Sequence, residues 1–263
     1  MSILAEIAEK TRQRVAEEKK SLPLPQLRAQ AEAMDASTGF PFAQALAAPG
    51  MSFICEVKKA SPSKGLIAPN FPYLDIAKEY QAAGAAAISC LTEPYWFQGS
   101  DQYLKEIAQA VTIPVLRKDF TVDEYMIYGA KVLGASAVLL ICAILDDGQL
   151  KDYLALAHSL GLSALVEAHD ETELNRALSA GAGIIGVNNR DLRTFTVDVS
   201  NSLRLRKFAP PEVLFVSESG IKTPEDIQKL YDNGTNAVLI GETLMRAPDK
   251  KAMLAQLRGG TTA

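Results

Sequence analysis

The chain has 263 residues, a length typical of one large globular domain. Hydrophobic residues make up 48% of it and charged residues 22%, which excludes a disordered or fibrous chain. The formal net charge is −4, so we expect neither a nucleic acid nor an acidic membrane to be bound by bulk electrostatic attraction. Any anionic ligand must therefore be held by a local group of donors and cations.

The N-terminal segment "MSILAEIAEKTRQRVAEEKK" mixes acids with bases and holds no long apolar stretch. We therefore expect no signal peptide, no membrane anchor and a cytoplasmic protein. Cys55, Cys90 and Cys142 lie in apolar runs without the C-x-x-C spacing of metal or redox sites, so we expect reduced core cysteines. His158 lies in a helical segment and His169 in a loop after a predicted strand, each without a companion at metal-ligand spacing. No metal is expected.

Residues 1–48 are predicted to form a helical extension packed on the main fold. Apolar side chains recur there at helical spacings, at Ile3, Leu4, Ile7 and Val15. The segment "LPLPQLRAQAEAM" then restarts a helix after a proline break. The main fold is expected to begin at residue 49.

Eight short runs rich in apolar and β-branched residues follow between residues 49 and 263, separated by amphipathic segments. They begin near positions 53, 85, 114, 137, 164, 183, 212 and 237. The starts lie roughly 20 to 32 residues apart, which leaves room for one strand, one crossover helix and two loops. This regularity predicts an α/β fold, a closed (β/α)8 TIM barrel that forms a single domain with its extension. A doubly wound sheet is the alternative, although no G-x-G-x-x-G opens a helix after the first strand.

Polar residues cluster at the ends of the predicted strands, where barrel enzymes build their active sites. Strand alternation places Glu56 with Lys58 on one face of the first strand, and Lys118 with Phe120 on one face of the third. If residues of the opposite parity pack against helices, these charges point into the barrel mouth. Buried charges are costly unless paired or used, so these groups, with Glu167 of the fifth strand, predict an acid/base site. We expect their proximity to lower the lysine pKa values.

The last two strands carry a different signal. The segments "SESGIKTPEDI" and "IGETLMRAPD" each bring a glycine and small hydroxyl residues to the start of a helix. Barrel enzymes repeatedly bind phosphate at this place. A tight turn with a helix N-cap would explain either segment alone, but the two segments together predict a phosphate site.

Seven stretches in chain order resemble the strand-end motifs of the indole-3-glycerol phosphate synthases, from the N-terminal extension to about Arg246. They are "FICEVKKASPSKG", "LTE…WFQGS", "VLRKDF", "LVEAH", "GVNNRDL", "SESGI" and "LIGETLMR". The resemblance implies a lyase of tryptophan biosynthesis. Its reaction closes the indole ring of 1-(2-carboxyphenylamino)-1-deoxyribulose 5-phosphate and releases carbon dioxide and water. It also implies that no cofactor and no metal is needed.

The resemblance implies specific roles for the polar residues. Lys118 matches the general acid that protonates the ketone oxygen. Lys58, Glu56 and Glu167 match residues that carry out the later proton transfers. Which of the three acts in which transfer stays open. Asn188 and Arg190 match positions that orient the substrate and neighbouring carboxylates.

The resemblance also implies a phosphate site and an apolar slot. The phosphate positions, with Lys58 nearby, are Ser61, Ser219, Gly220, Gly241 and Glu242. Some family members have serine at the last position, so the Glu242 side chain must turn away from the phosphate or be offset by a cation. Phe120, Leu139 and Leu140 are expected to line the slot for the aromatic ring, with Trp96 or Phe97 as a lid.

Two rival functions stay open. One is another phosphate-binding barrel enzyme, such as an aldolase with a single Schiff-base lysine. The other is a barrel that binds phosphorylated ligands without chemistry, although the acids, bases and Asn188 are all present. We expect a monofunctional protein with a small phosphorylated substrate, no nucleic-acid or membrane partner, and a monomeric or weakly dimeric state.

Overall fold

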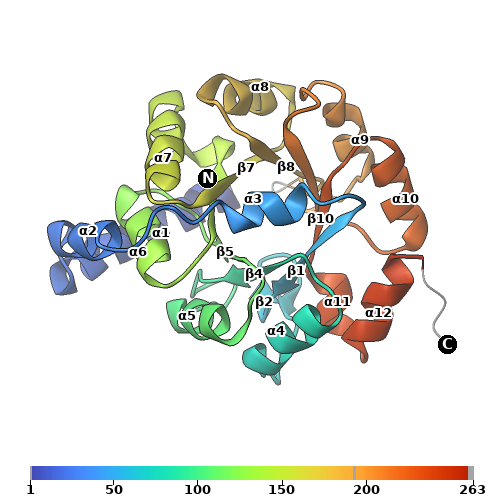
Figure 1. Ribbon diagram of the computed structural model, residues 1–263, viewed down its shortest axis with the longest axis horizontal. Helices are drawn as coiled ribbons and strands as arrows, with labels where there is room; N and C mark the ends of the chain where they lie inside the picture. Colours follow the sequence, from blue (N-terminus) through green and yellow to red (C-terminus); the bar gives the residue numbers. More distant parts are fainter. Residues whose placement is uncertain (1, 192–193, 260–263) are drawn as a thin grey trace.

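The computed structural model describes residues 2–191 and 194–259 (Figure 1). Eight parallel strands close into a barrel in the order β1-β10-β9-β8-β7-β6-β5-β4, which confirms the predicted (β/α)8 fold. The observed strand starts agree with the predicted ones to within two residues. The strands are β1 (Ser52–Val57), β4 (Ala87–Leu91), β5 (Val115–Lys118), β6 (Ala137–Ile141), β7 (Ser163–Ala168), β8 (Ile184–Asn188), β9 (Leu214–Glu218) and β10 (Ala237–Ile240).

Helices surround this barrel (Figure 1). Five of the turns that lead from a surrounding helix back into a strand contain a glycine with positive φ, a conformation that costs other residues a steric penalty. These are Gly84, Gly134, Gly161, Gly181 and Gly234. The surrounding helices are α4 (Tyr73–Ala82), α5 (Asp101–Ala110), α6 (Glu124–Val132), α7 (Asp147–Ser159), α8 (Glu171–Ala180), α9 (Ser200–Arg206), α10 (Pro224–Asp232), α11 (Glu242–Arg246) and α12 (Lys250–Leu257), with the 3₁₀ turn η1 (Cys142–Ile144) after β6.

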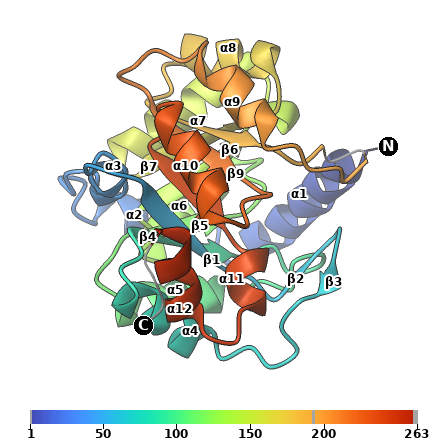
Figure 2. The ribbon, with the colours of Figure 1, turned by 90° about the vertical axis from the view of Figure 1, so that its right-hand side faces the viewer.

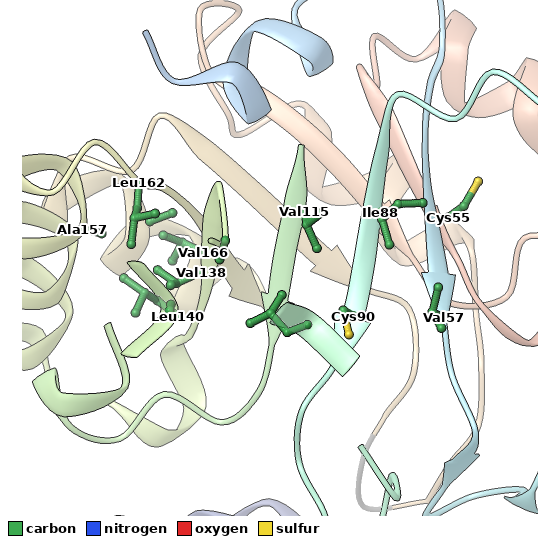
Figure 3. Packing of buried hydrophobic residues seen from close by; sticks show 14 of the residues in the cluster. Cys55, Val57, Ile88, Cys90, Val115, Val138, Leu140, Ala157, Leu162 and Val166 are labelled. Carbon is green, nitrogen blue, oxygen red and sulfur yellow. The ribbon is translucent and has the colours of Figure 1, made fainter. Parts of the chain in front are cut away.

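Strand alternation divides the core into two layers. Residues of one parity, such as Ile54, Leu116 and Leu165, fill the inside of the barrel. Residues of the other parity pack outward against the helices; Figure 3 shows several of them, including Cys55, Cys90 and Leu140. The three cysteines are free and buried, as expected. The strand-end charges that continue the inner parity are therefore directed into the mouth.

Three helices precede the barrel: α1 (Ile3–Ser21), α2 (Leu24–Glu32) and α3 (Pro41–Leu46). Helix α3 buries Phe42 and Leu46 in the inner cluster beside Ala137 and Ala237, the first residues of two strands, so it closes the amino end. Helix α1 contributes Ile7 to the same cluster from the opposite side. Figure 2 shows α3 and α1 at the two ends of the barrel.

A short hairpin of β2 (Ala60–Ser61) and β3 (Gly65–Leu66) follows β1. It was not predicted, because its strands are too short to show alternation. Gly65 has φ of +61° at the turn, and the carbonyl of Lys59 accepts hydrogen bonds from Ile67 and Ala68. Among the described residues, no helix is long and apolar enough to cross a membrane.

Candidate active site

Glu56 and Lys58 form an ion pair at the carboxyl end of β1, with 2.9 Å between Nζ of Lys58 and Oε2 of Glu56. Both side chains are largely buried, at 5% and 16% exposure for Glu56 and Lys58. Gly241 at the end of β10 makes room for the pair, because a Cβ there would lie 2.7 Å from both atoms. A side chain at this position would displace the ion pair of the neighbouring strand.

Lys118 lies deeper in the mouth, between two buried carboxylates. Its Nζ is 3.6 Å from Oε2 of Glu167 and 3.5 Å from Oε2 of Glu218. Burial by itself would lower the pKa of Lys118, but the charges of Glu218, Glu167 and Glu56 raise it. The expectation of a lowered pKa is therefore wrong for this lysine, because it faces carboxylates and not a second cation. Lys118 is held in its protonated form.

The two carboxyl groups beside Lys118 have opposite pKa shifts. Burial raises the pKa of Glu218 to about 7, supported by the nearby charges of Glu167 and Glu56 and opposed by Lys118. Burial would also raise the pKa of Glu167, but Lys118, His169 and Asn188 lower it to about 2. Glu218 was not predicted as a site residue. The signal was its parity with the inward-facing Val216 on β9.

Asn188 and Arg190 extend the site from the end of β8. Nδ2 of Asn188 donates to Oε1 of Glu167 at 3.3 Å, and Oδ1 of Asn188 accepts from the backbone N–H of Arg190 at 3.0 Å. Nη1 of Arg190 donates to the carbonyl of Phe195 at 3.3 Å. Arg190 also lines both the cavity of the acid/base groups and the cavity of the predicted phosphate site, so it lies between them.

A cavity of about 600 Å³ lies beside this cluster; we call it the cationic cavity. Ser219 and Gly220 line it in the left-handed conformation, with φ of +69° and +85°. A Cβ at Gly220 would collide with Val197, so this close approach of the backbone needs glycine. Gly241 and Glu242 also line it, together with the cations Lys58, Lys64, Arg190, Lys222 and Arg246.

Glu242 is offset by cations in this cavity. Its Oε1 lies 3.5 Å from Nζ of Lys64 and 3.1 Å from Nε of Arg246. Burial would raise the pKa of Glu242, but the hydrogen bond and charge of Arg246 and the charge of Lys64 lower it. An ionised carboxylate is therefore accommodated at the position where some family members carry serine. Ser61, on β2, lines the adjoining cavity of the mouth with Lys58 and Lys118.

An apolar slot lies beside the acid/base cluster. Phe120 and Phe97 pack with ring centroids 6.0 Å apart, and Ile3, Leu4 and Ile7 of α1 line the same cavity. Leu139 and Ile141 line the inner part of the slot beside Lys118 and Glu167. The prediction of Leu140 as a slot residue is wrong, because its parity directs it outward against the helices.

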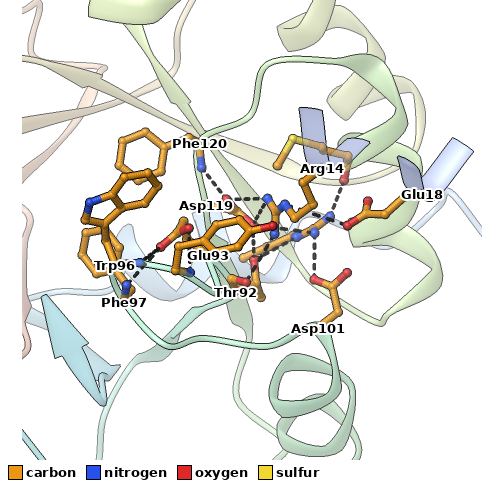
Figure 4. Close-up of polar contacts among 12 residues, drawn as sticks. Arg14, Glu18, Thr92, Glu93, Trp96, Phe97, Asp101, Asp119 and Phe120 are labelled. Carbon is orange, nitrogen blue, oxygen red and sulfur yellow. Dashed lines mark hydrogen bonds and ion pairs between the residues drawn. The ribbon is translucent and has the colours of Figure 1, made fainter. Parts of the chain in front are cut away.

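Glu93 orders the loop that carries the aromatic residues of the slot (Figure 4). Its carboxylate accepts hydrogen bonds from the backbone N–H groups of Tyr95, Trp96 and Phe97, at 2.7 to 3.0 Å. Trp96 and Phe97 pack against the inner cluster as a result. Whether either acts as a lid stays a prediction.

A buried polar network fixes α1 beside the site (Figure 4). Nη2 of Arg14 donates to both carboxylate oxygens of Asp119, at 3.0 and 2.9 Å, and Thr92 donates to Oδ2 of Asp119 at 2.6 Å. Arg117 links Thr92 to Asp101, with 2.7 Å between its Nη2 and Oδ1 of the aspartate. Because Asp119 follows Lys118 directly, this network also fixes the end of β5.

Taken together, a closed (β/α)8 barrel with a buried lysine–carboxylate cluster beside a cationic cavity defines a barrel enzyme built for acid/base chemistry on an anionic substrate. The family model described as indole-3-glycerol phosphate synthase matches residues 4–257. The chain belongs to the indole-3-glycerol phosphate synthase family, and it is a carboxy-lyase of tryptophan biosynthesis.

Relatives named indole-3-glycerol phosphate synthase match nearly the whole chain. One from Ruminiclostridium cellulolyticum is 56% identical over 98% of this chain and 99% of its own length. Another, from Lachnoclostridium phytofermentans, is 51% identical over 97% of this chain and 98% of its own. Among solved structures, a 3-hexulose-6-phosphate synthase shares the fold at 16% identity and a TM-score of 0.64, over 80% of this chain and 99% of that one.

Proposed function

We propose that this chain closes the indole ring of 1-(2-carboxyphenylamino)-1-deoxyribulose 5-phosphate and that Lys118 is the general acid. The observation that carries this assignment is the buried Lys118 ammonium, held protonated by Glu167 and Glu218 at the floor of the apolar slot. An aromatic ring in the slot and a phosphate in the cationic cavity bring the ketone of the connecting chain between them.

The first step forms the carbon–carbon bond. The ring carbon that bears the carboxylate attacks the ketone carbon, and Lys118 gives a proton to the ketone oxygen, which becomes a hydroxyl. The carbon–carboxylate bond then breaks, carbon dioxide leaves, and its electron pair restores the aromatic ring. A positioned acid contributes on the order of a hundredfold or more to such a step.

The second step removes the new hydroxyl as water. It needs an acid on the hydroxyl oxygen and a base for the proton on the neighbouring carbon. We assign the acid to Lys58, which Glu56 holds at the slot, and the base to Glu218, whose pKa of about 7 suits proton transfer near neutrality. Glu167 stays ionised and stabilises the positive charge that develops as the hydroxyl leaves.

The cationic cavity holds the phosphate. Lys58 and Arg190 supply positive charge, and the backbone N–H groups of Gly220, Gly241 and Glu242 supply donors. Ser219 and Ser61 add hydroxyl groups at the edge. We further propose a monomer or a weak homodimer as the working form.

The experiment is turnover of the carboxyphenylamino-deoxyribulose phosphate, followed by indole fluorescence. We expect wild-type turnover, a loss of about a hundredfold or more in kcat for Lys118→Met, and no trapping by borohydride. Full turnover by Lys118→Met contradicts the general-acid assignment. Tight substrate binding without wild-type turnover favours the non-catalytic barrel, and borohydride trapping favours a Schiff-base enzyme.

A further inference from the structure

His169 lies two residues beyond Glu167 and is fixed from several sides. Nε2 of its ring is 3.3 Å from Oε1 of Glu167, and Nδ1 is 3.0 Å from Oε2 of Glu173. Its backbone N–H donates to the same oxygen of Glu173 at 2.8 Å, and its carbonyl accepts from Nδ2 of Asn201 at 3.0 Å. The ring therefore has little freedom to turn.

The start of helix α8 places the second carboxylate. Asp170 is the N-cap, and its side chain accepts a hydrogen bond from the backbone N–H of Glu173 at 2.9 Å. Glu173 lies in the first helical turn, where the helix dipole favours a negative charge. Its side chain then extends back over His169 and is only 17% exposed.

The contacts indicate an imidazolium. Nδ1 hydrogen-bonds Oε2 of Glu173, whereas the buried Nε2 has no hydrogen-bond partner and faces Oε1 of Glu167 at 3.3 Å. In a neutral imidazole the unprotonated nitrogen would turn its lone pair toward one of these carboxylates, whereas both nitrogens of an imidazolium carry a proton. Burial alone would lower the pKa of His169, but its contacts with the carboxylates of Glu167 and Glu173 raise it to about 10. The ring is therefore positively charged at neutral pH.

The two carboxylate oxygens of Glu167 contact different residues. Oε1 faces His169 and accepts from Asn188, while Oε2 faces Nζ of Lys118. We propose that His169 is a positioning residue of the active site: its imidazolium, anchored by Glu173, holds the Glu167 carboxylate in the orientation that presents Oε2 to Lys118. This inference rests on the proposed roles of Lys118 and Glu167.

Other charged groups face the same region. His169 opens on a cavity between α1 and the ends of β7 and β8, lined by Asp170 and Glu173 of the α8 segment, Arg12 of α1, and Arg190, Asp191 and Asp198 after β8. The carboxylates of Glu167 and Glu173 form ion pairs with the ring, at 3.3 and 3.0 Å. Loss of the Glu173 charge is therefore expected to lower the pKa of His169 more than loss of the charge of Asp170, Asp191 or Asp198.

The first test is the titration of His169 by NMR. The chain has two histidines, so the variant His158→Asn leaves the His169 ring as the single imidazole signal. We expect His169 to stay protonated through neutral pH and to titrate near the value of about 10, and its pKa to fall in Glu173→Gln and in Glu167→Gln. A ring that is neutral at pH 7 in the otherwise unchanged protein overturns the proposal.

The second test is kinetic. We expect His169→Gln to lower kcat by about tenfold or more with little change in KM, since the ring does not lie in the slot or the cationic cavity. In Glu173→Gln, kcat should equal that of the wild type at low pH and fall as pH rises through the lowered pKa of His169. His158→Asn is the matched control and should keep the wild-type profile.

The two readouts separate the possible failures. Unchanged kcat in His169→Gln, or a wild-type pH profile in Glu173→Gln, overturns the positioning role. Absence of turnover in the wild type overturns the proposed function instead. In that case the NMR titration still decides the inference, because an unaltered His169 pKa in Glu167→Gln would show that the ring does not hold this carboxylate.

Discussion

Lys58 and Lys59 follow β1 directly and, as neighbours in the chain, continue its alternation with opposite parity. Lys58 pairs with Glu56 and lines the cationic cavity. We expect Lys58→Ala to lower kcat/KM by about a hundredfold, because it removes a phosphate cation and the acid of the dehydration step. Lys59→Ala is the matched control and should stay near the wild-type value in the fluorescence assay. Equal losses in the two variants would contradict the parity argument.

Glu218 makes stability depend on pH. Its pKa is about 7 in the folded chain and roughly 4.3 when unfolded, so the folded state binds more protons between these values. The free energy of unfolding therefore falls as pH rises through this window. We expect Glu218→Gln, which never ionises, to raise the urea midpoint at about pH 8 and to leave it unchanged near pH 4. A gain of equal size at both pH values would contradict the shifted pKa.

At the residue scale, strand parity predicted most of the site's geometry. It directed Glu56, Lys58 and Lys118 inward, and the structure has them there. The same rule places Glu218 inward and Leu140 outward, yet Glu218 received no role and Leu140 was assigned to the slot. The carboxylate partners of each lysine could not be predicted from the sequence, because the distance between side chains of different strands depends on barrel geometry.

At the scale of elements, α1 depends on one buried ion pair. Asp119 has no exposed side-chain surface, and burial would raise its pKa, but Arg14 and Arg117 lower it. We expect Arg14→Met to lower the free energy of unfolding by about 3 kcal/mol, because the buried Asp119 loses the nearer of its two cationic partners. Urea unfolding measures this. Arg12→Met, on the exposed side of the same helix, is the control and should cost under about 1 kcal/mol.

The helices and strands were predicted better than their contacts. Regular apolar runs indicated each barrel strand, and spacing indicated the helices of the extension. The Arg14–Asp119 pair joins residues 105 positions apart and leaves no periodic trace in the sequence. The position of α1 over the slot therefore required the structure.

At the scale of the whole molecule, both ends of the barrel are covered by residues 3–46. Helix α3 closes the amino end and α1 lies over the mouth (Figure 2). The barrel itself was predictable because eight similar units repeat. The positions of α3 and α1 at the two ends were not predictable, because a single amphipathic helix can pack on any apolar surface of matching shape.

This arrangement has a consequence for the order of folding. The extension is synthesised first, yet Phe42, Leu46 and Ile7 pack in a cluster that includes Ala237 and Leu239 of the last strand. Contacts this distant in the sequence form late, because a long loop must close first. In pulsed hydrogen exchange during refolding, the amides of α1 should gain protection no earlier than those of β10, and earlier protection would contradict this order. Helices α1 and α3 are thus synthesised before the strand that completes the cluster on which they pack.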